Sequence, residues 1–145
     1  MFDPREIVKL EELRRLERLQ RDYALFAYAP HSKQEIFHRN GDKKRRYLRT
    51  GNRFGKSTCG SAEDAAFAIG ERPWMEKDDP DRFKGIPQRP TKGLILAADW
   101  DKAREIFTSM EEGQRGKLMQ WIPVDRLLPP KKNQSGEIDC IPVKS

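Results

Sequence analysis

Apolar positions recur with near-helical spacing over the first part of the chain. Ile7 and the four leucines that follow it, up to Leu19, lie three residues apart. Because a helix turns every 3.6 residues, this stripe winds around the helix instead of staying on one face. Asp3 followed by Pro4 is typical of a helix start. A helix is therefore predicted from there to about Tyr28, and it can pack on its own domain or on a neighbouring subunit.

Four more segments carry helix signals. Ser32 is a candidate cap for a short helix, and Gly70 is a candidate terminator of an alanine-rich one. Asp99 or Asp101 is a candidate cap for a third helix. Asn40–Asp42, after the first of these helices, predicts a turn. These helices are predicted over Ser32–Arg39, Lys56–Ile69, Lys102 to about Glu112, and Gln114–Trp121.

Alternating or continuous apolar runs predict three strands. The run 93–98, Gly-Leu-Ile-Leu-Ala-Ala, is the clearest candidate for a buried strand, and Arg45–Arg49 and Glu137–Val143 are weaker ones. The proline-rich and charged segment 71–91 predicts a long loop. Strands that alternate with helices favour an α/β fold with parallel crossover connections.

Composition narrows the class of protein. The chain has 145 residues, enough for one ordinary domain, and its net charge of +6 favours polyanionic partners. Cys59 and Cys140 show no paired spacing, and the two histidines do not form a zinc-ligand pattern. There is no apolar run of about 20 residues and no signal-peptide pattern. These features predict a soluble, intracellular protein.

One stretch carries recognisable chemistry: the segment from Thr50 to Ser57, Thr-Gly-Asn-Arg-Phe-Gly-Lys-Ser. It ends as a phosphate-binding P-loop does. Gly55 would let the backbone approach a phosphate, Lys56 would reach the β- and γ-phosphates, and the Ser57 hydroxyl would bind magnesium. The pattern places glycine where Thr50 stands, with Gly51 one residue later. An ordinary turn that opens a helix is the alternative, but a strand candidate before it and a helix candidate after it favour phosphate binding.

The segments 28–38 and 46–57 together resemble the start of the terminase large subunits of tailed phages. Those proteins show a block of proline, glutamine and Phe-His, followed by a Gly-Asn-Arg-x-Gly-Lys-Ser/Thr loop. Gly70, Pro73 and Trp74 also resemble the continuation of the family, so the likeness spans about residues 28–75.

The resemblance implies particular roles. Gln34 would read the adenine edge, for which a side-chain amide has both a donor and an acceptor. Arg53 would stabilise the γ-phosphate from within the same chain, and with Lys56 it would act in catalysis. Phe54 departs from the small residue common at its position. ATP and Mg²⁺ are the implied cofactors, with Ser57 as metal ligand. The implied nucleotide-binding set is Gln34, Thr50, Gly51, Asn52, Arg53, Phe54, Gly55, Lys56, Ser57 and Thr58.

The resemblance also implies an organisation. Residues 1–29 would form an N-terminal helical segment, and residues 30–145 part of a P-loop ATPase domain, an incomplete parallel sheet flanked by helices. The run 94–99 ends in Asp99 like a Walker B strand, but Trp100 stands in place of the glutamate, which favours Asp99 as a helix cap. With neither a Walker B site nor the nuclease domain identified, the chain is expected to be a fragment or a truncated product that hydrolyses ATP poorly.

The parent protein of such a family packages double-stranded DNA into proheads. Its implied partners are the DNA, the portal protein and the terminase small subunit, in a ring oligomer within the host cytoplasm. The basic run 43–46 is more typical of a charged turn than of a DNA contact, so DNA binding follows from the resemblance alone. A helicase-like ATPase, a small-molecule kinase or a non-catalytic assembly module are the alternatives, and an apolar strand ending Asp-Glu beyond Ser145 would favour the motor.

Overall fold

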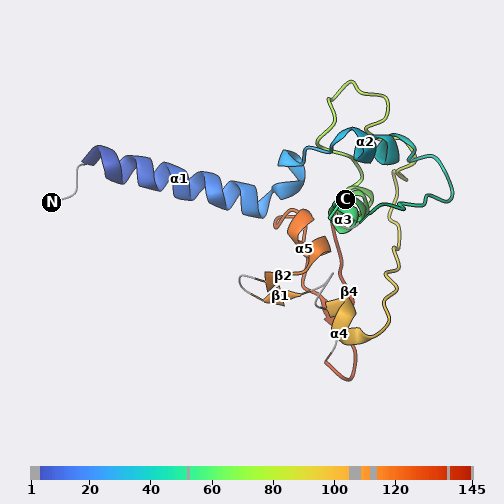
Figure 1. The fold of residues 1–145 in the computed structure, drawn as a ribbon. Helices are drawn as coiled ribbons and strands as arrows, with labels where there is room; N and C mark the ends of the chain where they lie inside the picture. Colours follow the sequence, from blue (N-terminus) through green and yellow to red (C-terminus); the bar gives the residue numbers. More distant parts are fainter. Residues whose placement is uncertain (1–3, 52, 105–108, 112–113, 137, 145) are drawn as a thin grey trace.

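The computed structural model describes residues 4–51, 53–104, 109–111, 114–136 and 138–144. Helical elements dominate this part of the chain, and the strands are short (Figure 1). The elements are α1 (Pro4–Asp22), the 3₁₀ helix η1 (Ala24–Ala27), α2 (Ser32–Arg39), α3 (Lys56–Ile69), α4 (Trp100–Ala103), β1 (Met110–Glu111), β2 (Gln114–Arg115), α5 (Lys117–Trp121), β3 (Lys131–Lys132) and β4 (Ile138–Cys140).

The N-terminal helix forms as predicted but ends earlier. α1 projects away from the other elements (Figure 1), and its apolar side chains, from Ile7 to Leu19, are each about half exposed. After Asp22 the chain tightens into η1, which places Leu25 in the core with no exposed surface. The proposed cap Asp3 lies outside the described residues.

The helices α2 and α3 match the predicted bounds. His31, not Ser32, is the N-cap of α2, and the Gln34 side chain accepts a hydrogen bond from the His31 backbone N–H at 3.1 Å. α3 ends at Ile69 and is followed by Gly70, whose φ of +95° gives the left-handed backbone that closes a helix. The turn predicted over Asn40–Asp42 is also present.

The core lies where α3 meets α5 and η1. α3 contributes small side chains, so neighbouring elements approach it closely, and larger aromatic residues fill the remaining space. The Tyr28 ring contacts two tryptophan rings: its centroid lies 5.0 Å from that of Trp74 and 5.1 Å from that of Trp121. The buried residues of this cluster are Leu25, Tyr28, Ala62, Ala65, Ile69, Leu118 and Ile122.

Two of the three predicted strands are wrong. Residues 93–98 are not a buried strand: the segment runs without regular structure to α4, with Leu94 and Leu96 more than 80% exposed. Residues 45–49 form no strand either, and Tyr47 is almost fully exposed. A strand needs a neighbour to satisfy its backbone groups, and neither segment has a paired strand among the described residues.

The C-terminal part holds two small antiparallel pairings. Met110–Glu111 pairs with Gln114–Arg115, so the predicted helices over these residues are wrong there, and α5 begins only after Gly116. β3 pairs with β4, which confirms part of the predicted last strand. The strands of the described residues pair only in this antiparallel way, and the parallel sheet of a P-loop domain is not among their pairings.

Candidate nucleotide-binding site

The start of α3 has backbone features that also occur in phosphate-binding loops. Gly55 is its N-cap and has a φ of +78°, a left-handed conformation that favours glycine. Arg53, two residues earlier, also has a positive φ, of 62°. No side chain caps this end of the helix, so N–H groups of the first turn remain open to an anion. Asn52 lies outside the described residues.

Lys56 folds back over this loop. Its Nζ donates a hydrogen bond to the Thr50 carbonyl oxygen at 3.2 Å, so the ammonium group lies across the loop that precedes α3. The Thr50 hydroxyl donates to the Gly51 carbonyl oxygen at 3.3 Å. Lys56 and Ser57 are both exposed, and Thr58 is half-buried. Lys56 and Ser57, which are predicted to bind phosphate and magnesium, therefore lie together at one accessible helix end.

Gln34 connects α2 to the same loop. Its Nε2 lies 3.4 Å from the carbonyl oxygens of both Phe54 and Gly55, to which it donates. Its Oε1 accepts from the His31 N–H and, at 3.5 Å, from the Tyr28 hydroxyl. The amide is 5% exposed and bonds within the protein. Reading an adenine edge would require at least one of these groups to change partner.

The space beside Gly55 is restricted by this amide. A Cβ added at Gly55 would lie 2.9 Å from the Gln34 Nε2. The positive φ favours glycine here, and a Cβ would in addition require the flexible Gln34 side chain to shift. This contact with Gln34 could not be read from the sequence.

Phe54 packs against the start of α2. Its ring meets the His31 ring edge-on, with centroids 4.5 Å apart, and the Lys33 ammonium lies 5.9 Å from the Phe54 centroid. The residue that departs from the terminase pattern thus makes one of the contacts between the loop and the start of α2. Lys33 adds a cation near the loop that the sequence alone did not single out.

Behind the loop, α3 carries a buried carboxylate that sequence reasoning missed. Glu63 accepts hydrogen bonds from His38 Nδ1 at 2.7 Å, from Arg72 Nη2 at 2.6 Å and from Arg46 Nη1 at 2.6 Å. Glu63, His38 and Arg72 are each at most 2% exposed. Glu63 lies four residues after Cys59 and one after Ala62, on the face that also packs into the core, and this spacing was the signal available.

The charge of Glu63 is stabilised by these partners. Burial raises the pKa of this carboxyl. Hydrogen bonds from His38, Arg72 and Arg46 and the charge of Arg72 lower it by more than burial raises it, so the pKa is about 2. Burial raises the pKa of the neighbouring Cys59 thiol to about 11. Cys59 therefore remains a thiol at neutral pH, which argues against a nucleophilic role.

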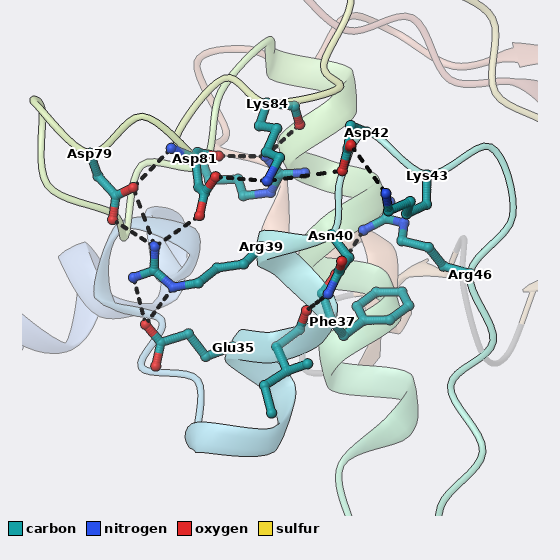
Figure 2. A network of polar contacts seen from close by, with 12 residues as sticks. Glu35, Phe37, Arg39, Asn40, Asp42, Lys43, Arg46, Asp79, Asp81 and Lys84 are labelled. Carbon is teal, nitrogen blue, oxygen red and sulfur yellow. Dashed lines mark hydrogen bonds and ion pairs between the residues drawn. The ribbon is translucent and has the colours of Figure 1, made fainter.

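The far side of α2 is tied to the 71–91 loop. Figure 2 shows the Arg39 guanidinium between Glu35, Asp79 and Asp81, with distances of 2.7, 3.2 and 3.0 Å. Arg72 belongs to this loop: its Nη1 donates to the carbonyl oxygens of Asp81 and Lys84 at 2.9 Å each, and its Nη2 donates to Glu63 on α3 at 2.6 Å. This loop is thus anchored to α2 and α3 by arginine side chains.

Comparison of the chain with protein-family models, with curated proteins and with solved structures found no match. Within the residues that the structure describes, no group of three or more His, Cys, Asp and Glu side chains is arranged to hold a metal ion. The described helices include none that is long and apolar enough to cross a membrane.

Proposed function

We propose that this chain binds ATP with Mg²⁺ at the start of α3, as the nucleotide-binding part of a terminase large subunit. The observation that carries the proposal is the left-handed Gly55 at the uncapped start of a 14-residue helix, followed directly by Lys56 and Ser57. Backbone N–H groups, the positive end of a helix and a lysine are the groups that a nucleotide triphosphate needs.

In this proposal each side chain has a defined task. Lys56 exchanges the Thr50 carbonyl for the β- and γ-phosphates, and Ser57 supplies a hydroxyl ligand for Mg²⁺. Arg53 lies on the exposed turn just before Gly55 and would face the γ-phosphate. Gln34 both braces the loop and reads adenine. Magnesium, when bound, neutralises phosphate charge.

The wider role is part of the same proposal. The chain would belong to the ATP-driven motor that packages double-stranded DNA into proheads, acting in a ring with the portal protein and the terminase small subunit in the host cytoplasm. The parallel sheet of a P-loop domain is likewise proposed. Support for this role comes from the resemblance of residues 28–75. Because no Walker B residue is identified, the activity proposed for this chain is binding, with little turnover.

Titration with a fluorescent ATP analogue and Mg²⁺ tests the proposal, and the chain offers a matched control. Lys56 and Lys117 are both exposed, both begin a helix, and both follow a glycine N-cap. Lys56→Ala should weaken binding about tenfold or more, the equivalent of one charge-assisted hydrogen bond. Lys117→Ala should leave it unchanged. Equal affinities for wild type and both variants would reject the site.

Gln34→Ala separates the two tasks of that residue. If Gln34 reads adenine, the variant should lose any preference for ATP over GTP. If it only braces the loop, ATP and GTP should weaken by the same factor. Both nucleotides are titrated in parallel, with the exposed Ile36→Ala as a control for a change on the same helix.

A further inference from the structure

A second basic site lies beside the turn that follows α2. The turn at residues 41–46 borders a cavity of about 510 Å³, walled by Phe37 and Phe67 and reaching Gly85. This site shares no residue with the loop at 50–58. Figure 2 shows Phe37, Asp42, Lys43 and Arg46 in this region.

The base of this site is held in a fixed arrangement. Gly85 has a φ of +72°, and a Cβ added there would lie 2.0 Å from the Gly41 carbonyl oxygen. A Cβ at Gly41 would lie 2.2 Å from Arg72 Nη2 and 2.4 Å from the Lys84 carbonyl oxygen. The backbones of the two turns therefore touch, with the buried Arg72 guanidinium beneath them. The rim at 41–46 is positioned by this contact.

Aromatic rings, absent from the basic run in the sequence, come from α2 and α3. The Arg46 guanidinium lies 4.6 Å from the Phe37 centroid and 5.7 Å from the Phe67 centroid. Its Nη1 donates to the Phe37 carbonyl oxygen at 3.1 Å and to the buried Glu63. Arg46 is thus a fixed part of the wall, and the two phenylalanine rings beside it supply apolar surface.

The rim carries an excess of positive charge. Lys43 and Lys44 both line the cavity and are exposed, and Arg45, which follows them in the sequence, is exposed too. Asp42 is the acidic residue of the lining, 3.6 Å from Lys43 Nζ and 4.0 Å from Lys84 Nζ. Lys84 lies outside the lining and is closer to Asp81, at 3.1 Å. With Arg46 paired to Glu63, Lys43 and Lys44 stand against the one charge of Asp42, so the lining keeps a positive charge.

We propose that this site binds the phosphodiester backbone of a nucleic acid. Lysine ammonium groups act as point charges that suit phosphate, whereas recognition of carboxylates favours the arginine fork, and the fork in this wall is already engaged with Glu63. Lys43 and Lys44 contact neighbouring phosphates, and the sugar packs against the Phe37 and Phe67 edges. Contacts of this kind position a strand without reading its bases.

Fluorescence anisotropy with a labelled 20-base-pair DNA duplex tests the site, using the whole chain without nucleotide. The variant Lys43→Ala/Lys44→Ala is compared with Lys131→Ala/Lys132→Ala, a second pair of adjacent exposed lysines with the same change in net charge. Each phosphate contact contributes about 0.9 to the slope of log affinity against log salt. The first variant should therefore lose about 1.8 of slope and bind about tenfold more weakly or worse, and the second should match wild type.

Equal losses in both double variants, or none in either, would overturn the proposal, since binding would then follow net charge or lie elsewhere. Displacement of the duplex by poly-glutamate as readily as by unlabelled DNA would also overturn it. Single-stranded DNA of the same length is titrated in parallel, and whichever form binds more tightly identifies the partner.

The nucleotide proposal and this one can fail separately. Lys56→Ala should keep full DNA affinity, and Lys43→Ala/Lys44→Ala should keep full affinity for the ATP analogue. Loss of both activities in the 43/44 variant would indicate damage to the fold and would count against a site confined to this rim. Urea unfolding of the same samples measures that damage directly.

Discussion

The two long helices of this protein place charge in opposite environments. α1 is rich in Glu and Arg, and its described side chains up to Arg21 are exposed to solvent. α3 is mostly alanine and small residues, yet it buries the carboxylate of Glu63 among His38, Arg46 and Arg72. Figure 1 shows α1 extending away from the body and α3 at its centre.

This difference shows that the number of charged residues in a helix says little about their energetic weight. A charge in water loses little when its partner is removed, because solvent replaces the interaction. A buried charge has no such replacement, so removing one partner exposes the others to the full cost of desolvation. The few charges on and around α3 should therefore dominate stability, although α1 carries many more.

The substitution Glu63→Gln should have the largest effect on stability and tests this contrast between α1 and α3 most directly. It preserves shape but leaves the Arg72 guanidinium, and part of the Arg46 guanidinium, without a counter-charge. The free energy of unfolding should fall by about 3–5 kcal/mol, as for other buried pairs that lose one member. Urea unfolding followed by tryptophan fluorescence measures it, because Trp74 and Trp121 flank Tyr28 in the core.

Glu71→Gln serves as the control for that measurement. Glu71 also accepts from an arginine, Arg82, at 2.8 Å, but its side chain is 31% exposed. Its loss should cost about 1 kcal/mol or less. Equal effects at Glu63 and Glu71 would mean that burial does not set the weight of these ion pairs.

Acid provides a second test of the buried carboxylate. The pKa of Glu63 falls from an ordinary 4.5 to about 2 on folding. A lowered folded-state pKa contributes stability above about pH 4.5 that is lost as the pH falls toward 2. A shift of this size corresponds to about 3 kcal/mol. Other carboxyls also titrate in this range, so the informative quantity is the difference between wild type and Glu63→Gln.

That difference should shrink steadily between pH 5 and about pH 2. It is obtained from urea midpoints measured at several pH values in the same buffer series. A difference that stays constant across this range would show that Glu63 is not held as a buried carboxylate.

The helices could be predicted because their signals are local. The bounds of α3 follow from Gly55 at its start and Gly70 at its end, and both are read directly from the chain. The strand at 93–98 could not be judged in this way, since a strand is stable only with partners. Its apolar sequence is compatible with burial, but Leu94 and Leu96 are exposed in the structure.

In the candidate site, too, local features could be predicted and long-range contacts could not. The P-loop motif predicted Gly55, Lys56 and Ser57 at one helix end, and the structure places them there. The contacts from Gln34 to Phe54 and Gly55 join residues about 20 positions apart, and no local pattern encodes them. The Glu63 partners come from α2, the basic turn and the loop after α3, so their convergence is a property of packing.

The smallest expected effect comes from α1. Glu11 and Arg15 are one turn apart on α1 and both exposed. Glu11→Gln should change the free energy of unfolding by less than about 0.5 kcal/mol, the range of such pairs on helix surfaces. The measurement is the same urea titration, repeated at low and high salt, because salt screens an exposed pair far more than a buried one. A loss at Glu11 as large as that at Glu63 would mean that α1 is not solvated on this face, and the contrast between the two helices would then fail.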